Sequence, residues 1–207
     1  MMKIEKFVLG SVATNCYLLV NEDTREVVIV DPATCPEYLL LHMKSNGYSP
    51  KAILLTHGHF DHVMGIDGWV QAYDIPVYLH EEEQEVLEQP QLNLSTAFGK
   101  QYAYQRTTQL KDGEILSVAG FQFQVIHTPG HTKGSCCYYE KKEEVLMSGD
   151  TLFCRSVGRS DFPTGNGRVL AESIRQKLFC LPDEVMVYPG HDRLTCIGEE
   201  KQHNPFV

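Results

Sequence analysis

The sequence predicts an α+β fold in which two sheets pack together and helices lie outside them. Both halves of the chain run strands first and a helix later, and each strand is short and apolar. In the first half, strands are expected over 3–9, 15–20 and 27–30, followed by a helix over 37–45. In the second half, strands are expected over 115–118, 121–126, 136–139 and 145–148, followed by a helix over 169–179. Two halves of this kind favour a layered arrangement, because each apolar sheet face must be covered.

The middle of the chain alternates between strands and helices. Ala52–Leu55 is predicted as a buried strand, with a helix over 66–73 behind it and a strand over 77–79. An acidic helix is expected over 81–88. The polar region 89–109 has no clear period, and we expect it to form a loop over the site. A last strand is expected over 185–187, and the tail that follows is short and polar.

Length and charge limit the classes of function. The 207 residues suit one domain, which we expect to span 1–207, and 43% hydrophobic with 22% charged residues is ordinary for a globular protein. The formal net charge of −9 disfavours nucleic acid and anionic membranes as partners. No apolar run approaches transmembrane length. We therefore expect a small-molecule substrate, and the oligomeric state stays open.

Seven cysteines are present, an odd number without a C-x-x-C pair: Cys16, Cys35, Cys136, Cys137, Cys154, Cys180 and Cys196. Irregular spacing of this kind indicates free thiols in a reducing compartment. Phe7–Leu9 is too short for the apolar core of a signal peptide. A cytoplasmic location is therefore expected.

The stretch that follows the strand 52–55 carries four potential metal ligands within six residues. They are the side chains of His57, His59, Asp61 and His62, and Gly58 allows a tight turn between the first two. Borderline divalent metals favour this mixture of imidazole and carboxylate ligands. The pattern predicts a metal-binding loop at the carboxyl end of a strand.

Three more candidate ligands each follow a predicted strand and a glycine. They are His131, Asp150 and His191, and the preceding glycines are expected to let the backbone come close to a crowded centre. Five histidines and two aspartates are too many for one tetrahedral zinc. They suit two metals that share one bridging carboxylate.

For several further polar residues, both a structural and a functional role are compatible with the sequence. Asp31 ends the strand 27–30, where it could orient a ligand histidine from outside the metal shell or could serve as a turn or helix-cap residue. The remaining histidines, namely His42, His80, His127 and His203, are assigned to packing or to the surface and not to the metals.

The motif His57-x-His59-x-Asp61-His62, followed in order by His131, Asp150 and His191, resembles the metallo-β-lactamase superfamily. Gly149–Phe153, Gly158–Pro163 and the tail from Thr195 make it most similar to the short bacterial type of glyoxalase II-like (hydroxyacylglutathione hydrolase-like) thioester hydrolases. The resemblance implies a four-layer αβ/βα sandwich with the metals at one edge of the two sheets. It further implies that His57, His59 and His131 bind one metal, that Asp61, His62 and His191 bind the second, and that Asp150 bridges them.

Two divalent ions are thus expected as cofactors, with zinc favoured and iron or manganese compatible with the same ligands. Two cations that flank one water lower its pKa and give hydroxide near neutral pH, which would attack a carbonyl carbon. Asp61 is expected to act catalytically by orienting this nucleophile. A thioester suits the site because a thiolate leaves without protonation by a strong acid. No G-x-S-x-G elbow is present, and a role for Cys154 as a nucleophile is disfavoured.

Substrate recognition rests on fewer residues. The resemblance implies a basic substrate-binding residue nine positions after the bridging aspartate, which is Arg159 here. Asp161 stands where glutathione-specific relatives have a tyrosine, and Arg159 could instead pair with it. Only 16 residues follow His191, so the helical domain that larger relatives use for glutathione is not expected. A glutathione thioester is therefore one candidate substrate among others.

Other activities share this ligand pattern. A persulfide dioxygenase would hold a single iron and consume oxygen, and a lactonase or β-lactamase-like hydrolase would use the same site. Metal binding without turnover is disfavoured because no ligand is missing. A flavin-linked di-iron role is also disfavoured, because His59 stands where those proteins carry a glutamate.

Overall fold

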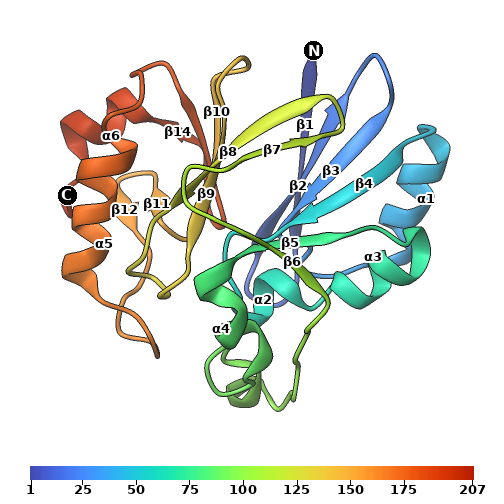
Figure 1. Ribbon diagram of the computed structural model, residues 1–207, viewed down its shortest axis with the longest axis horizontal. Helices are drawn as coiled ribbons and strands as arrows, with labels where there is room; N and C mark the ends of the chain where they lie inside the picture. The colour runs from blue at the N-terminus through green and yellow to red at the C-terminus, as the bar shows by residue number, and fades with distance from the viewer.

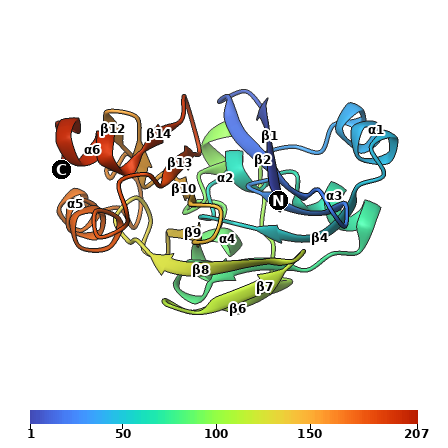
Figure 2. The same ribbon diagram turned by 90° about the horizontal axis from the view of Figure 1, so that it is seen from above.

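The computed structural model describes all residues from 1 to 207. Two six-stranded sheets face each other, and helices cover the outer face of each (Figure 1). Seen from above, the layers follow one another as helices, sheet, sheet and helices (Figure 2). The α+β fold class and the four-layer sandwich expected from the sequence are thereby confirmed.

The first sheet combines an antiparallel and a parallel part. Its strands in spatial order are β1 (Met2–Leu9), β2 (Thr14–Asn21), β3 (Glu26–Val30), β4 (Ser49–Leu54), β5 (Val77–His80) and β6 (Thr107–Leu110). Pairs β1–β2 and β2–β3 are antiparallel, whereas β3, β4, β5 and β6 run parallel. Because parallel strands end at the same edge of a sheet, the loops after β3 and β4 start close together.

The second sheet is mostly antiparallel. Its strands in spatial order are β14 (Thr195–Cys196), β13 (Met186–Pro189), β10 (Val145–Gly149), β9 (Cys136–Glu140), β8 (Phe121–His127) and β7 (Ile115–Val118). Only β10 and β13 pair in parallel, so the residues after both strands reach one edge. A small hairpin of β11 (Leu152–Phe153) and β12 (Ser156–Val157) follows β10.

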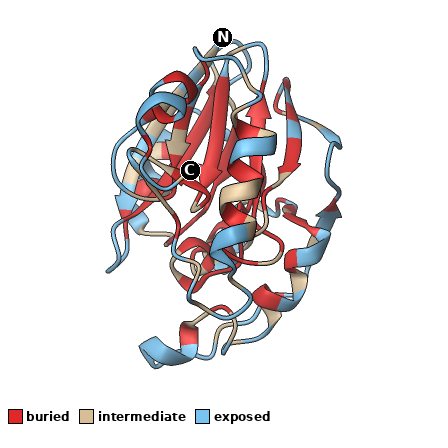
Figure 3. Cartoon of the chain, turned by 90° about the vertical axis from the view of Figure 1, so that its left-hand side faces the viewer, coloured by how far each residue is buried: buried red, intermediate tan, exposed pale blue.

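The helices are short and lie mainly on the outer faces of the sheets. The α-helices are α1 (Glu37–Ser45), α2 (Phe60–Val63), α3 (Ile66–Tyr73), α4 (Gln84–Glu88), α5 (Gly167–Ser173) and α6 (Ile197–His203). Tighter turns are η1 (Glu81–Glu83) and η2 (Ser95–Phe98), and α5 continues into the wider turn η3 (Ile174–Leu178). Viewed from the α5–α6 side, buried strands lie behind helices that expose one side and bury the other (Figure 3).

Strand β2 shows how the two-layer core is built. Its successive side chains alternate between faces: Leu18 belongs to the cluster under α1 and α3, whereas Tyr17 and Leu19 belong to the cluster between the two sheets. Phe123 and Tyr138 of the second sheet fill the same inner cluster and are fully buried. Both faces of the central strands are therefore covered, which explains their continuous apolar runs.

The structure corrects some of the expected elements. The polar region 89–109 is not only loop, because strand β6 begins within it at Thr107. The short polar tail, for which no element was predicted, forms β14 and helix α6. The expected helix 81–88 divides into η1 and α4, and the expected helix 169–179 into α5 and η3. These elements are short or polar, so their sequences carry no clear period.

None of the helices combines the length and apolar character that crossing a bilayer would require.

Candidate metal centre

The motif between β4 and α2 lies at the edge where the two sheets meet. After β4 ends at Leu54, an extended stretch presents His57 and His59, and the short helix α2 then presents Asp61 and His62. The change from extended backbone to helix separates the two pairs of side chains. The segment His57–His62 can therefore present ligands to two different metal positions.

The structure brings the other three predicted ligands to the same place. His131 lies in the loop after β8, Asp150 directly follows β10, and His191 follows β13 after one residue. All seven predicted metal ligands come together at this edge. None of the four histidines assigned elsewhere belongs to a group that could hold a metal.

One set of three imidazole nitrogens converges on a single point. His131 Nε2 lies 3.2 Å from His57 Nε2 and 2.9 Å from His59 Nδ1. All three side chains are buried. Tetrahedral zinc with nitrogen ligands at about 2.0–2.1 Å requires nitrogen atoms about 3.3 Å apart. The spacing of this set is close to that requirement.

A second set combines two imidazoles with a carboxylate. Asp61 Oδ2 lies 3.2 Å from His191 Nε2 and 3.6 Å from His62 Nε2. Thr14 Oγ1 donates a hydrogen bond of 2.8 Å to the same carboxylate oxygen. This set has the mixed nitrogen and oxygen donors that divalent zinc, iron and manganese all accept.

Asp150 lies between the two sets. Its Oδ1 is 3.4 Å from His62 Nε2, and its Oδ2 is 3.6 Å from both His131 Nε2 and His191 Nε2. One carboxylate therefore faces a nitrogen of each set. This is the position that a bridging ligand requires.

Unsatisfied polar atoms show that these residues fit a pair of cations. His62 Nε2 and Asp150 Oδ1 are buried without a hydrogen-bond partner, although such atoms are normally paired. Burial lowers the pKa of His62, but the carboxylates of Asp61, Asp150 and Asp31 outweigh it and raise the pKa to about 10. Positive charge next to these carboxylates is therefore stabilising, and divalent ions would supply it.

The pKa values of the imidazoles in the first set (His57, His59 and His131) are shifted downward, opposite to that of His62. Burial, followed by the neighbouring histidines, holds the pKa values of His57 and His59 well below the usual range. Burial also lowers the pKa of His131. These rings are therefore neutral at physiological pH and offer lone pairs to a metal without first losing a proton.

Asp31 supports the ligands from outside the cluster. It adopts a left-handed backbone conformation with φ 50° and accepts hydrogen bonds from Thr56 N (2.8 Å) and Thr56 Oγ1 (2.7 Å). It also contacts His62 Nδ1 at 2.9 Å, which leaves His62 Nε2 facing Asp61 and Asp150. Asp31 lies close enough to His57 and His62 to form a third possible metal group, but these hydrogen bonds occupy its oxygens. The geometry is that of a residue that orients a ligand.

The loop that carries His191 is held by strand β2 of the opposite sheet. Asn15 N donates to Gly190 O at 2.7 Å, and Asn15 Nδ2 donates to Pro189 O at 2.9 Å. The hydroxyl of Tyr17 donates to the same Pro189 carbonyl at 2.7 Å. The N-terminal hairpin thus positions a ligand more than 170 residues away.

The glycines before the ligands do not all have the role expected of them. A Cβ at Gly149 would lie 2.2 Å from Thr56 Oγ1, and one at Gly190 would lie 2.2 Å from Asp150 Oδ1. Both glycines therefore allow a close approach within the site. At Gly130 the expectation is wrong, because its nearest neighbour is the backbone of Leu170 in the middle of α5, 2.3 Å from an added Cβ.

A cavity of about 430 Å³ opens over the ligands. His59, Asp61, His131, Asp150 and His191 contribute to its floor, and its remaining walls are largely apolar. The apolar wall residues are Val12, Phe60, Leu94, Phe98, Phe153, Val157 and Phe162. Phe98 belongs to the region expected to lie over the site. A cavity of this size suits a small molecule.

Arg159 lines this cavity but is not free. Its guanidinium pairs with Asp161 through Nε–Oδ1 (2.9 Å) and Nη2–Oδ2 (2.7 Å) and lies 4.1 Å from the ring centroid of Phe162. The Arg159 carbonyl accepts from His131 Nδ1 at 2.7 Å, which orients that ligand. The pairing with Asp161 is the structural alternative considered for this residue.

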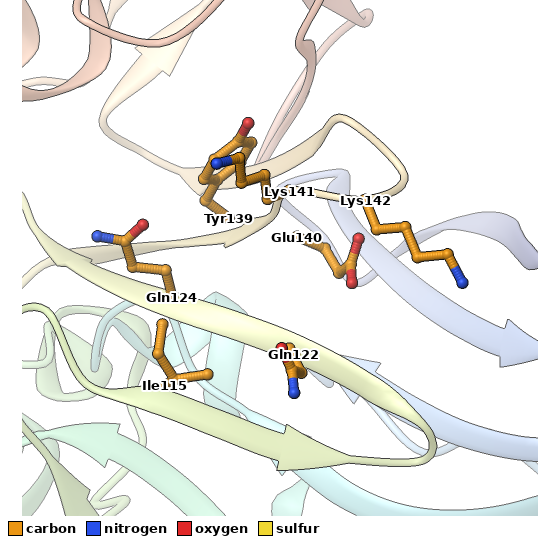
Figure 4. A pocket seen from close by; sticks show the side chains of 7 residues that line it. All are labelled: Ile115, Gln122, Gln124, Tyr139, Glu140, Lys141 and Lys142. Atoms are coloured by element: carbon orange, nitrogen blue, oxygen red, sulfur yellow. The ribbon is translucent and has the colours of Figure 1, made fainter.

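A second hollow, of about 500 Å³, is lined by residues of β7, β8, β9 and the turn after β9 and shares no residue with the metal cluster (Figure 4). Its lining is mostly polar: Ile115, Gln122, Gln124, Tyr139, Glu140, Lys141 and Lys142. No metal-binding group and none of the predicted site residues is among them.

Besides Asn15 and Tyr17, sequence reasoning missed two further residues that contact the ligands or their loops. Thr14, which donates to Asp61, sits at the start of a strand with no motif around it. Glu83 is fully buried and accepts a hydrogen bond from Gly58 N at 2.8 Å, between the first two histidines. It lies in the run Glu81–Glu83, at the start of the predicted acidic helix, and no sequence signal separates it from its neighbours.

Two facing sheets with a histidine and aspartate cluster at their shared edge define a metallo-hydrolase. The family model described as "Metallo-beta-lactamase superfamily" matches residues 9–191, and the chain belongs to that superfamily. The family resemblance stated from the motif is therefore confirmed.

Two relatives align with the whole chain. The "Probable metallo-hydrolase YqgX" of Bacillus subtilis is 36% identical and is covered over 98% of its length. The "Hydroxyacylglutathione hydrolase GloC" of Haemophilus influenzae is 34% identical and is also covered over 98% of its length. A relative named as a hydroxyacylglutathione hydrolase, the glyoxalase II activity, thus aligns with this chain over nearly its full length.

Solved structures that share this fold differ in the names given to the proteins. BLEG-1, a B3 metallo-β-lactamase, is 42% identical with a TM-score of 0.93, and 99% of each chain is covered. TTHA1623 in a di-iron-bound form is 37% identical with a TM-score of 0.86, covering 98% of this chain and 100% of that one. ETHE1 from Myxococcus xanthus is 30% identical with a TM-score of 0.82, covering 99% and 84%.

Proposed function

We propose that this metallo-hydrolase cleaves a thioester such as S-lactoylglutathione, with two zinc ions held by the seven clustered ligands. The observation that carries the proposal is the complete pair of ligand sets at the floor of an apolar cavity. The relative named hydroxyacylglutathione hydrolase, aligned over the full chain, supports the thioester as substrate.

Bound in these two sets, divalent ions would activate water and polarise the substrate carbonyl. Asp61 is proposed to orient the attacking water, because its Oδ2 is fixed by the hydrogen bond from Thr14 and the residue lines the floor of the cavity. His62 and His191 hold their Nε2 atoms toward the same carboxylate. The phenylalanines that line the cavity make its walls apolar, and a less polar surrounding strengthens these electrostatic interactions.

The lining of the cavity suits a leaving group that needs no proton. No lysine, tyrosine or cysteine lines it, and the histidines on its floor are proposed metal ligands, which leaves Ser156, Arg159 and Asp192 as the other polar groups. A thiol has a pKa of about 8.5, and its thiolate leaves near neutral pH without a strong acid. This supports a thioester over an amide. Cys154 lies outside the cavity walls, which is consistent with water as the nucleophile.

Recognition of an anionic thiol portion is proposed to involve Lys100 as well as Arg159. A smaller pocket of about 250 Å³ adjoins the main cavity and shares Phe60, Asp61 and Phe98 with it. Lys100 lines this pocket, is exposed, and forms no ion pair. The guanidinium of Arg159 is already neutralised by Asp161, so the ammonium of Lys100 is the freer of the two cations.

The test is hydrolysis of S-lactoylglutathione by zinc-loaded protein, beside Asp150→Ala and the exposed control Asp23→Ala. We expect about two metal equivalents by mass spectrometry, cleavage by the wild type and the control, and loss of cleavage in Asp150→Ala. Protein that carries two equivalents and cleaves no thioester offered would overturn the substrate assignment. A metal content below one equivalent would overturn the dinuclear centre.

A β-lactamase activity is the second candidate, and the similarity to BLEG-1 favours it. Nitrocefin turnover faster than thioester turnover would establish it. The persulfide dioxygenase alternative needs only one iron, whereas the complete second set of ligands supports two ions. Oxygen uptake with a glutathione persulfide is the measurement that separates this alternative from hydrolysis.

We place the protein in the cytoplasm. All seven cysteines are free thiols in the structure, which supports a reducing compartment.

A further inference from the structure

Glu83 is a buried carboxylate that lies behind the metal centre. It ends the turn η1 and has no exposed surface. No cation is among its hydrogen-bond partners, which are a hydroxyl and two backbone amides. Burying a carboxylate is costly unless donors compensate it, so these three contacts explain how it is tolerated.

The three donors come from two different ligand loops. Glu83 Oε1 accepts from Gly58 N at 2.8 Å, and Gly58 separates His57 from His59. Glu83 Oε2 accepts from Thr132 Oγ1 at 2.8 Å and from Gly134 N at 2.9 Å. Thr132 directly follows the ligand His131. One side chain therefore ties together the backbone on both sides of the three-imidazole set.

The packing around Glu83 leaves these loops little freedom. A Cβ added at Gly134 would lie 2.3 Å from the backbone nitrogen of Glu83, and one at Gly58 would lie 2.9 Å from the backbone nitrogen of Leu87 in α4. Both loops thus touch the η1–α4 segment directly. None of the three hydrogen bonds involves a residue beside His191, and the set that contains His191 is held from other directions.

We propose that Glu83 is a positioning residue for one half of the metal centre, fixing the loops that present His57, His59 and His131. The Asp61–His62–His191 set is oriented by Thr14 and Asp31. Asp31 also reaches the first set, because it accepts two hydrogen bonds from Thr56, whose hydroxyl lies 3.2 Å from His57 Nδ1. None of the hydrogen bonds of Glu83 reaches Asp61, His62 or His191 directly. This role of Glu83 rests on the dinuclear centre proposed above and is independent of the substrate.

The experiment is titration of metal-free Glu83→Gln with Zn²⁺ and, separately, with Co²⁺, whose visible absorption reports each set. A glutamine keeps one acceptor oxygen, but its amide N–H groups face an N–H donor of Gly58 or Gly134, so one loop is released. His131→Ala and His191→Ala, which each remove one ligand, provide the reference spectra for the two sets.

We expect Glu83→Gln to weaken one metal equivalent by about 10- to 100-fold, as is usual when an outer partner of a ligand is lost. Its remaining Co²⁺ spectrum should match that of His131→Ala. Unchanged affinity for both equivalents would overturn the proposal, as would equal weakening of both or a spectrum that matches His191→Ala.

Glu200→Gln is the matched control. Glu200 is also buried and also has three donors, Arg155 N at 2.9 Å, Thr195 Oγ1 at 2.6 Å and Asn204 Nδ2 at 2.8 Å, but it belongs to helix α6 and contacts no predicted ligand. It should lose stability without changing either metal affinity. If Glu83→Gln does not fold, Thr132→Val removes one donor and keeps the carboxylate, and it should weaken the same equivalent to a smaller degree. Wild-type affinity in that variant would contradict the proposal.

Discussion

Gly190 lies directly against the carboxylate of Asp150. A Cβ added at Gly190 would be 2.2 Å from Asp150 Oδ1 and 2.6 Å from His62 Cε1. Both distances are far below van der Waals contact, and the neighbours are proposed metal ligands. The absence of a side chain at position 190 is therefore a requirement of the centre itself.

Gly190→Ala is expected to displace Asp150 and to abolish metal binding by the Asp61–His62–His191 set. A displacement of about 1 Å in a catalytic group lowers turnover by about 100-fold, and we expect a loss of at least this order. Metal content and thioester turnover are the measurements.

Gly47→Ala is the control, because a Cβ there meets nothing within 4 Å. Because Gly47 has φ +64°, Gly47→Ala should lower the free energy of unfolding by about 1–2 kcal/mol. The metal content should stay unchanged. Full metal content in Gly190→Ala would contradict the geometry.

The pH dependence of stability should include a contribution from His80. Its ring stacks on His127 with centroids 4.1 Å apart, and its buried Nε2 has no partner. Burial, followed by His127, lowers the pKa of His80 from 6.5 to about 4. The folded state thus favours the neutral ring, so this contribution is complete above pH 6.5 and is lost as the pH falls toward 4.

His80→Asn should flatten that part of the pH profile, because asparagine does not titrate and can still accept from Glu82 N. The difference in unfolding free energy between pH 6.5 and pH 4 should shrink by at most about 3 kcal/mol. Urea unfolding at a series of pH values measures it. The exposed His203→Asn serves as the control. A profile identical to that of the wild type would show that His80 is protonated equally in both states.

Metal removal should destabilise the whole protein. The carboxylates of Asp31, Asp61 and Asp150 surround His62, and without divalent ions their charge is poorly compensated. Free zinc at 1,000 times its dissociation constant stabilises a protein by about 4 kcal/mol, so a chelator should lower Tm by roughly 8 °C or more.

Differential scanning calorimetry with and without chelator measures the effect of metal removal. The double variant His131→Ala/His191→Ala, which lacks a ligand of each set, should respond much less to the chelator. An unchanged Tm in wild-type protein shown to be metal-free would contradict this prediction.

Lys100→Ala is expected to raise KM for an anionic thioester while kcat stays near the wild-type value. An exposed ion pair contributes up to about 1 kcal/mol, which corresponds to a KM increase of up to about fivefold. A neutral thioester should show no such change. Lys111→Ala, which removes the same charge from an exposed site outside both pockets, is the control. Equal effects on anionic and neutral substrates would remove Lys100 from recognition without affecting the thioesterase proposal.

The fold could be predicted because its strands are apolar runs bounded by turns, and the seven candidate ligands because each stands at the end of such a run. His57 to His62 form one local motif, whereas His131, Asp150 and His191 carry little signal singly. Only their order along the chain linked them to that motif. That order was sufficient because the segments after β4, β8, β10 and β13 all meet at the shared edge of the two sheets.

What could not be predicted depends on contacts between distant segments. Glu83 lies in an acidic run, and only the loop of Thr132, 49 residues away, reveals its burial. Asn15 is an ordinary strand residue until the loop of Pro189 packs on it. The role expected of Gly130 was wrong for the same reason, because the helix that it touches begins 37 residues later in the chain. A sequence pattern cannot report such pairings.

The hydrogen bonds from Asn15 and Tyr17 to the loop before His191 have a practical consequence. The hairpin of β1 and β2 contributes no ligand, yet one edge of the centre rests on it. Injury to this hairpin, by proteolysis or by a bulky fusion at the first residues, should therefore first appear as an enzyme that is folded but fails to retain its second ion. Measurements of metal content will detect such damage before circular dichroism does.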